Sequence, residues 1–331
     1  MNIGIIGDGQ LGRMMALSGY HLGFNFGFLG SKNSPSGNLG KVFSTIEELD
    51  NFADVITYES ENTPLDFLKN LKTTVFPPPC ALKITQNRTF EKALFTKLNI
   101  PVAVNLTINS LKELQNAVLQ IGVPCIIKTT TQGYDGKGQV VLKNTNDCKN
   151  AWQELGEREL IVESFVDFDY EISAIAVFSE NEKAHYPLTK NTHKDGILIT
   201  SEVLENSILE EKTQNYINEI AKEFNYIGVL TIEFFVKNNE LIANEIAPRV
   251  HNSGHWSIDG AKTSQFENHL RAICGLPLGS TKKIYNKIVM QNIISDLPDI
   301  KKVMKDGDSS LHLYGKSARI GRKLGHINIC K

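Results

Sequence analysis

The chain has 331 residues, of which 41% are hydrophobic and 22% are charged, and its formal net charge at pH 7 is −2. These values are typical of a soluble globular protein of roughly two or three domains, and they give no reason to expect a nucleic acid or an acidic membrane surface as a partner. The chain opens with a strand pattern and contains no long apolar run, so secretion and membrane insertion are not expected. The five cysteines lack a CxxC spacing, which indicates reduced thiols in a cytoplasmic protein.

A glycine-rich turn follows the first predicted strand. Gly7, Gly9 and Gly12 form a GxGxxG motif before an amphipathic helix pattern, which taken alone predicts a dinucleotide-binding fold. That motif also requires an acidic residue about twenty positions further on, and residues 28–34 contain none. The turn would still favour an anion at the start of a helix. Strand and helix patterns alternate up to about Pro79, as in a doubly wound sheet.

Charged residues then follow a strand and lie on a helix. Glu59 and Glu61 come after the predicted strand at 53–56, where open α/β sheets bind ligands; two solvated loop carboxylates are the alternative. Within the predicted helix at 87–98, Arg88 and Lys92 lie one turn apart on the same face. Ordinary surface charges would explain this pair equally well.

Residues 128–142 (KTTTQGYDGKGQVVL) have the pattern of a loop that covers nucleotide phosphates. Lys128 ends a predicted strand at 124–127, and the glycines that follow let bare backbone N–H groups approach a ligand. Lys137 adds a positive charge to the loop. An ordinary β-hairpin turn is the alternative.

Residues 228–246 predict a β-hairpin that turns at 238–239. Pairing about that turn puts Glu233 opposite Asn244 or Glu245. Two carboxylates would then face each other within apolar strands, which like-charge repulsion disfavours. A divalent cation removes the conflict, and Mg²⁺ suits a site with few protein ligands that are all oxygens. A surface hairpin with solvated glutamates is the alternative.

The hairpin leads directly into a polar segment at 247–256 (APRVHNSGHW), which we expect to form a loop over a site. Arg249 offers a planar bidentate donor for a carboxylate, bicarbonate or phosphate. His251 could position an anion or transfer a proton near neutral pH, and Asn252 follows it. The spacing His251-x3-His255 lacks the helix and the glutamate of an HExxH motif, which argues against zinc.

Basic residues surround two glycines near the end of the chain. Residues 311–329 contain Lys316, Arg319, Arg322 and Lys323 between two strand patterns. This arrangement is typical of a phosphate clamp or of a solvated turn.

These motifs together resemble the ATP-grasp superfamily, and within it the N5-carboxyaminoimidazole ribonucleotide synthetases of purine biosynthesis. The resemblance rests on GYDGKG, on Glu233 and Glu245, and on NEIAPRVHNSGHW followed by SQFENHLRAICGLPL, and it extends from GDGQLGRM to GRKLGHIN. It implies a mixed α/β and α+β chain with an ATP-grasp fold. The expected domains are a Rossmann-like pre-ATP-grasp domain at 1–99, a small lid domain at 100–169, and a C-terminal ATP-grasp domain at 170–331.

The resemblance also implies roles for individual residues. The ATP-binding residues would be Arg88, Lys128, Gly133, Tyr134, Asp135, Gly136, Lys137, Gly138, Gln139, Glu163, Ser164, Phe165, Val166, Glu171, His193, Asn244 and Glu245. Within this set, residues 163–166 would contact the adenine, Glu171 would hold the ribose, and His193 would lie in a loop. The ribonucleotide would be bound by Gln10, Leu11, Glu61, Lys316 and Arg322, and bicarbonate by Arg249, His251 and Asn252, with Lys128 also catalytic. Glu233 and Glu245 would hold Mg²⁺, with Mn²⁺ as the alternative cation.

The expected activity is ATP- and bicarbonate-dependent carboxylation of the amine of 5-aminoimidazole ribonucleotide, with ADP and phosphate as the other products. The expected partners are these small molecules and a second copy of the chain in a homodimer. Another ATP-grasp ligase, such as a formate-dependent glycinamide ribonucleotide transformylase, is the main alternative. A dinucleotide-dependent oxidoreductase and a non-catalytic nucleotide-binding protein are weaker ones. Gln132 replaces a glycine common in the family, and the chain ends six residues after Gly325, so we expect a shortened but active enzyme.

Overall fold

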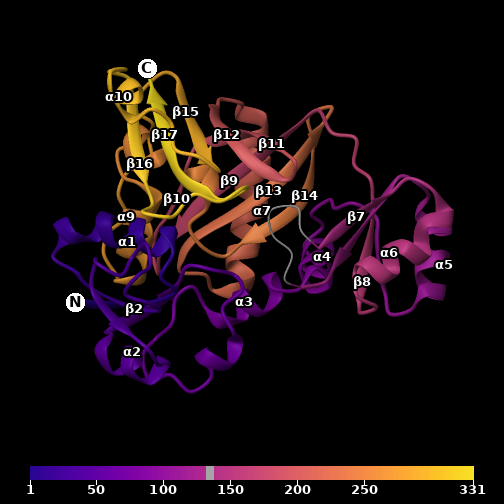
Figure 1. Cartoon of the computed structure of the whole chain (residues 1–331), viewed down its shortest axis with the longest axis horizontal. Coiled ribbons are helices and arrows are strands. Elements are labelled where there is room, and N and C mark those ends of the chain that lie inside the picture. The colour runs from indigo at the N-terminus through magenta and orange to yellow at the C-terminus, as the bar shows by residue number, and fades with distance from the viewer. Residues whose placement is uncertain (132–137) are drawn as a thin grey trace.

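The computed structural model describes residues 1–131 and 138–331, which form three sheets with their helices (Figure 1). The N-terminal sheet is parallel and has the strand order β3-β2-β1-β4. The elements of this region are β1 (Asn2–Ile6), α1 (Gln10–Gly19), β2 (Asn25–Leu29), β3 (Lys41–Phe43), α2 (Ile46–Phe52), β4 (Val55–Tyr58), α3 (Pro79–Thr85), α4 (Arg88–Lys97) and the 3-10 helices Tyr20–Leu22 and Leu65–Leu68. The alternating strands and helices confirm the predicted α/β character of this region.

The second sheet is small and antiparallel, with the order β5-β8-β6-β7. Its elements are β5 (Asn105–Ile108), α5 (Leu111–Ile121), β6 (Cys125–Thr129), β7 (Gln139–Leu142), a 3-10 helix (Thr145–Asp147), α6 (Cys148–Glu154) and β8 (Leu160–Ser164). Leu114 of α5 and Trp152 of α6 pack with Val162 in its core. Figure 1 shows this lobe on the right, apart from the large sheet.

The third sheet has nine strands in the order β14-β13-β9-β11-β12-β15-β17-β16, and β10 pairs with β9. Its elements are β9 (Tyr170–Phe178), β10 (Lys183–His185), β11 (Leu188–Lys194), β12 (Ile197–Leu204), α7 (Ser207–Phe224), β13 (Gly228–Lys237), β14 (Glu240–Ala247), a 3-10 helix (Asn252–Gly254), α8 (Ser257–Gly260), α9 (Gln265–Ile273), β15 (Ile288–Ile294), α10 (Ile300–Met304), β16 (Ser309–Leu313) and β17 (Lys323–Cys330). One face of α7 is apolar and buried, including Ile217, Ile220 and Phe224. β17 pairs with both β15 and β16.

Helix α9 joins the N-terminal domain to the large sheet. Its Leu270 shares a hydrophobic core with Met15 of α1 and Val229 of β13. His269 contacts both sides of this junction: its Nε2 lies 2.9 Å from the Thr57 hydroxyl, and its Nδ1 accepts the Val229 N–H at 3.1 Å. In Figure 1, α1 and α9 accordingly lie side by side at the lower left.

Two predicted positions differ from the structure. Strand β4 begins at Val55, so Glu59 directly follows its last residue. The expectation that His193 lies in a loop is wrong, because β11 continues to Lys194 and pairs with β12 through an irregularity at Thr192/His193.

Two further findings concern the whole described chain. Cys80, Cys125, Cys148, Cys274 and Cys330 are all free thiols. Across residues 1–131 and 138–331, none of the helices combines the length and the apolar character that a membrane span requires.

Candidate active site

A buried group of charged side chains lies where α4 meets the small sheet. Lys128 ends β6 beside β8, and its Nζ lies 2.8 Å from Oε2 of Glu163. The Nζ of Lys92 on α4 lies 3.9 Å from the other carboxylate oxygen. Burial favours the neutral form of Glu163, but the two lysines outweigh this effect and hold its pKa below the ordinary value. The Glu163 side chain therefore neutralises Lys128, a role that the sequence analysis did not give it.

Arg88 stands at the start of α4, directly beside the end of β6. Its guanidinium donates to the Thr129 carbonyl at 2.7 Å, and its own N–H donates to the Thr130 carbonyl at 2.8 Å. Arg88 and Lys128 thus bring two positive charges to one end of the strand. The phosphate-binding predictions for Gly133, Tyr134, Asp135, Gly136 and Lys137, and the departure at Gln132, lie outside the described residues. Gly138 and Gln139 lead into β7, where Gln139 pairs with Lys128.

The predicted adenine-binding segment continues from β8. The N–H of Ser164 donates to the Val104 carbonyl at 2.8 Å, so a donor to a base would have to come from a neighbouring residue. Phe165 is exposed and Val166 is partly buried. Their backbone groups are the candidates that this geometry favours.

Glu171 and His193 lie together on neighbouring strands of the large sheet. The Nδ1 of His193 is 2.7 Å from Oε2 of Glu171. Burial lowers the pKa of His193, but the Glu171 carboxylate more than offsets this effect, and the net pKa is raised. The two residues that were predicted to bind the nucleotide from separate segments therefore interact directly.

The two predicted metal ligands are paired across the hairpin. Glu233 lies opposite Glu245, and a bulge follows between Glu233 and Phe234. Burial, with the repulsion of Glu245, raises the pKa of Glu233 to about 7. The predicted register is therefore confirmed.

Neighbouring strands support Glu233 through a chain of hydrogen bonds. Ser173 donates to its Oε1 at 3.2 Å, Asn191 donates to the Ser173 hydroxyl at 2.7 Å, and Ser201 donates to the Asn191 side-chain oxygen at 2.8 Å. This chain runs across β9, β11 and β12. It fixes the carboxylate beyond what the hairpin alone would do.

Arg249 follows the end of β14 and contacts the N-terminal domain. Its Nε donates to Oε2 of Glu61 at 2.5 Å, and one terminal nitrogen donates to the Val250 carbonyl at 3.0 Å. Burial favours neutral Glu61, but the Arg249 charge is stronger and holds the Glu61 pKa below its ordinary value. Arg249, which was predicted to bind bicarbonate, is thus paired with Glu61, which was predicted to bind the ribonucleotide.

His251 lies between Arg249 and the carboxylate pair. Burial, with the Arg249 charge, lowers its pKa well below the ordinary value, so the imidazole is neutral at pH 7. The Ser253 N–H donates to Nδ1 at 3.3 Å, which leaves the proton on Nε2. That nitrogen lies 3.9 Å from Oε1 of Glu233. His251 can therefore donate a hydrogen bond toward the site, whereas proton uptake near neutral pH is disfavoured.

The rest of this loop turns toward the protein interior. The side-chain amides of Asn252 and Asn292 exchange two hydrogen bonds, at 3.0 and 2.7 Å. The contact with Asn292 uses one of the two hydrogens on Asn252 Nδ2. Asn252 would need its second hydrogen to donate to bicarbonate. His255 is buried, and its ring packs at a tilt against the rings of Phe266 and His326.

The glycine turn after β1 holds a carboxylate of the chain itself. Glu59 accepts the Gly9 N–H at 2.5 Å and the Gly12 N–H at 2.8 Å. A Cβ at Gly7 would lie 2.5 Å from the Glu59 Cγ, and Gly7 has a φ of +117°. These glycines therefore make room for Glu59 and present amides to it, so the place of a dinucleotide pyrophosphate is filled.

The predicted ribonucleotide residues converge from both ends of the chain. The Lys316 Nζ donates to the side-chain oxygen of Gln10. Leu11 packs in the hydrophobic core, so only its backbone N–H in the first turn of α1 could reach a ligand. Arg322 donates to the Ser317 hydroxyl at 3.0 Å in the loop between β16 and β17.

Two residues near the site were missed by the sequence analysis. Glu59 was noted but given no role, and Glu91 was not noted at all. Glu91 is buried on α4 together with Lys92, Leu94 and Phe95. Charged residues on the apolar stripe of an amphipathic helix were the signal that could have revealed it.

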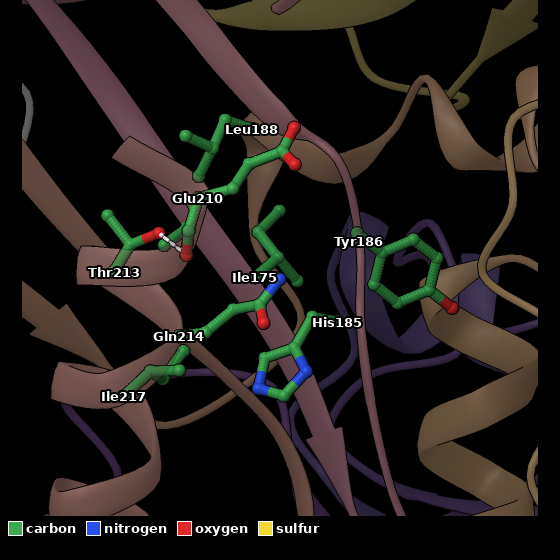
Figure 2. Close-up of a pocket in the computed structure, with 9 residues that line it drawn as sticks. Ile175, His185, Tyr186, Leu188, Glu210, Thr213, Gln214 and Ile217 are labelled. Atoms are coloured by element: carbon green, nitrogen blue, oxygen red, sulfur yellow. Dashed lines mark hydrogen bonds between the residues drawn. The ribbon is translucent and has the colours of Figure 1, made fainter. Parts of the chain in front are cut away.

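A small cavity lies outside this site. Figure 2 shows a cavity between β9, β11 and α7 that is lined by residues including Ile175, His185, Gln214 and Ile217. Its volume of about 10 Å³ is enough for roughly one water molecule. Among the described residues, no group of three or more His, Cys, Asp or Glu side chains is suited to a metal ion.

Three protein-family models match the chain. They are the ribonucleotide synthetase preATP-grasp domain over residues 1–86, the ATP-grasp domain over residues 93–266, and the phosphoribosylaminoimidazole carboxylase C-terminal domain over residues 288–331. The fold and the site therefore define an ATP-grasp enzyme. The N5-carboxyaminoimidazole ribonucleotide synthase of Pseudomonas aeruginosa is 42% identical over 99% of this chain and 94% of its own length. The chain belongs to the N5-carboxyaminoimidazole ribonucleotide synthase family.

Solved structures agree with this assignment. The N5-carboxyaminoimidazole ribonucleotide synthetase of Thermus thermophilus superposes with a TM-score of 0.94 at 40% identity, covering 99% of this chain and 93% of the other. The Aspergillus clavatus synthase, solved in complex with ADP and 5-aminoimidazole ribonucleotide, has a TM-score of 0.92 at 29% identity and covers 100% of this chain and 93% of the other.

Proposed function

We propose that this chain carboxylates the amine of 5-aminoimidazole ribonucleotide with ATP and bicarbonate, giving N5-carboxyaminoimidazole ribonucleotide, ADP and phosphate in purine biosynthesis. It is an ATP-dependent carbon-nitrogen ligase, as its family membership over nearly the whole chain requires. The Aspergillus clavatus complex with ADP and 5-aminoimidazole ribonucleotide supports the same two substrates here.

The observation that carries this proposal is the ion pair between Arg249 and Glu61, at 2.5 Å. Carboxylation of an amine requires an activated carboxyl group and the amine to meet at one point. Arg249 supplies the planar cationic donor suited to bicarbonate, and Glu61 supplies a carboxylate acceptor suited to the amine N–H. Their contact joins the two half-sites, which come from residues 188 apart in the sequence.

The carboxylate pair fits a small divalent cation. Glu233 and Glu245 offer only oxygen donors, and burial together with the nearby Glu245 raises the pKa of Glu233, an effect that a bound cation would oppose. We assign Mg²⁺, with Mn²⁺ as the alternative, to these two residues. When bound, the cation would neutralise phosphate charge and orient the ATP polyphosphate.

In the first step an oxygen of bicarbonate attacks the γ-phosphorus of ATP, the bond from that phosphorus to the β,γ-bridging oxygen breaks, and ADP leaves with carboxyphosphate formed. Lys128 and Arg88 stabilise the charge on the transferring phosphoryl group. Arg249 and the Nε2–H of neutral His251 hold the bicarbonate oxygens, with Asn252 as a further donor.

In the second step the amine nitrogen attacks the carboxyl carbon, the bond from that carbon to the phosphate oxygen breaks, and the departing phosphate takes up the proton that the nitrogen loses. Glu61 orients the amine by accepting one of its hydrogens. Lys316 and Arg322 bind the 5′-phosphate of the ribonucleotide, with Gln10 and the Leu11 N–H beside them. Closure around carboxyphosphate excludes water, which would otherwise hydrolyse it.

The adenosine part of ATP completes the arrangement. We assign the base to the backbone of residues 163–166 and the ribose to Glu171, with His193 beside it. Asn244 belongs to the same side of the site as Glu245. We also assign residues 133–139 to the binding of the phosphates.

ADP release from the purified chain with Mg²⁺ and ATP tests this function. Bicarbonate and 5-aminoimidazole ribonucleotide are supplied singly and together, and a parallel arm supplies formate with glycinamide ribonucleotide. We expect release to require bicarbonate and to rise with the aminoimidazole ribonucleotide. Release driven by the formate arm would overturn the proposal in favour of a transformylase.

The metal assignment has its own test. Glu245→Gln should abolish turnover and leave the circular dichroism spectrum unchanged. Near-normal turnover of that variant at saturating Mg²⁺ would contradict the assignment.

Two properties complete the proposal. We assign the protein to the cytoplasm, which the five free thiols support. We also assign it a homodimeric state, which light scattering of the purified protein would test.

A further inference from the structure

Strand β14, which carries Glu245, lies at one edge of the large sheet, and on its outer side Ala243 forms an isolated bridge with Val102. The remaining outward-facing backbone groups of an edge strand need other partners. This strand is also irregular, because Glu233 pairs with Glu245 while Phe234 pairs with Ala243, so Asn244 is an extra residue. A bulge at an edge leaves the local backbone poorly fixed by the ladder alone.

Helix α4 supplies partners on both sides of Glu245. Oε1 of Glu91 accepts the Ile246 N–H at 2.6 Å, and Nζ of Lys92 donates to the Asn244 carbonyl at 2.5 Å. Both charged residues are only 3% exposed. The two side chains are neighbours on one helix, so a single rigid element holds the backbone before and after Glu245.

The chemistry of Glu91 and Lys92 indicates that they position the backbone of β14 and do not merely attach α4 to its surroundings. Burying two ionisable side chains is costly, and apolar residues like Leu94 and Phe95 of the same helix would attach α4 to its surroundings at lower cost. A carboxyl oxygen and an amino group, by contrast, form hydrogen bonds of fixed geometry to an N–H and a carbonyl. That geometry is what a metal ligand on a bulged edge strand requires.

The contacts of Lys92 argue against a role as a phosphate ligand. Its Nζ is directed to the Asn244 carbonyl and lies 3.9 Å from Glu163. Lys128 and Arg88 already lie at the end of β6, where the phosphates are assigned. The side chain of Lys92 instead links α4, β14 and the small sheet.

We propose that Glu91 and Lys92 are positioning residues that hold the Glu245 backbone in place for cation binding by clamping Ile246 and Asn244. The metal-binding part of this inference rests on the proposed function. The clamp itself is a property of the ligand-free chain.

Hydrogen exchange of the ligand-free protein tests the clamp without reference to activity. Glu91→Leu removes the acceptor for the Ile246 N–H, and Lys92→Met removes the donor to Asn244. We expect peptides that contain Ile246 to exchange about tenfold faster in both variants, as the loss of a hydrogen bond at a buried backbone group predicts. Lys97→Met is the matched control, because Lys97 lies on the same helix but pairs with Glu223 instead.

Glu91→Gln distinguishes the clamp from a general electrostatic effect. It keeps a side-chain oxygen that can accept the Ile246 N–H but removes the negative charge. We expect its exchange to remain within about threefold of the wild type, since the acceptor is retained. Exchange about tenfold faster than in the wild type would overturn the proposal, and because the wild type is the reference, this variant decides the question even if the larger changes prevent folding.

Magnesium titrations extend the test to the site. The Mg²⁺ concentration for half-maximal ADP release should rise about tenfold in Lys92→Met, whereas the KM for ATP at saturating Mg²⁺ should stay within about threefold. A raised KM for ATP with unchanged Mg²⁺ dependence would overturn the proposal and indicate a phosphate contact. If the wild type released no ADP, the proposed function would fail, while the exchange data would still decide the clamp.

Discussion

His269 makes the junction between the N-terminal domain and the large sheet sensitive to acid. The Val229 N–H donates to its Nδ1, so protonation of that nitrogen requires the contact to break. Burial lowers the pKa of His269 to about 4 from an ordinary value of 6.5. Between these two pH values the unfolded chain takes up a proton at this residue and the folded chain does not. The free energy of unfolding therefore falls as the pH falls from 6.5 to about 4.

The size of this effect follows from the pKa shift. One pKa unit corresponds to ~1.36 kcal/mol, so the stability lost at this residue between pH 7.5 and pH 4.5 is about 2.5 kcal/mol. His269→Gln removes the titration and keeps an amide that can bond to Val229 or Thr57. The other buried histidines are present in both proteins, so their contributions cancel in the comparison.

Urea unfolding followed by circular dichroism measures the difference. We expect the free energy of unfolding of the wild type to fall by about 2.5 kcal/mol more than that of His269→Gln between pH 7.5 and 4.5. His21→Gln is the control, because His21 is exposed. Equal pH dependence of the wild type and His269→Gln would refute the reasoning.

Three further predictions concern the site. Glu59→Gln offers one oxygen where Gly9 and Gly12 present two N–H donors, so we expect a loss of about 1.5–3 kcal/mol in the free energy of urea unfolding; an unchanged value would show that one acceptor suffices. Arg249→Lys cannot keep both contacts of the guanidinium, so kcat/KM for bicarbonate should fall about 10- to 100-fold while the KM for ATP stays constant, and a change confined to the KM for ATP would contradict the assignment. Lys128→Met leaves Glu163 buried without its nearest partner and should lower the free energy of unfolding by roughly 3 kcal/mol. The double variant with Glu163→Gln should largely recover this loss in a double-mutant cycle, and purely additive effects would disprove the coupling.

Local patterns in the sequence were sufficient for the carboxylate hairpin. The turn at 238–239 sets the register of two adjacent strands, and the structure confirms that Glu233 pairs with Glu245. Turn position and strand alternation involve only residues close in sequence. The basic loop after β16 was recognisable for the same reason.

Contacts between distant segments could not be predicted in this way. Glu59 reaches Gly9 across 50 positions, Lys92 reaches Asn244 across 152, and His269 reaches Thr57 across 212. No local sequence pattern predicts the backbone group against which a given charged residue will be buried. The strand that includes His193 was also missed, because its pairing with β12 passes through an irregularity.

The carboxylate of Glu59 makes the glycine turn a site that the protein occupies itself. A tethered side chain loses no translational freedom when it binds these amides, whereas a diffusing phosphate must lose it and must also displace the carboxylate. Nucleotide analogues designed to bind the GxGxxG turn of this chain would therefore compete with the Glu59 carboxylate. Because Glu59 is part of the chain, its local concentration does not fall on washing or dilution. A GxGxxG motif can therefore form a turn that binds a carboxylate of the same chain instead of a phosphate. In this chain Glu59, the residue that follows β4, determines that the turn binds a carboxylate.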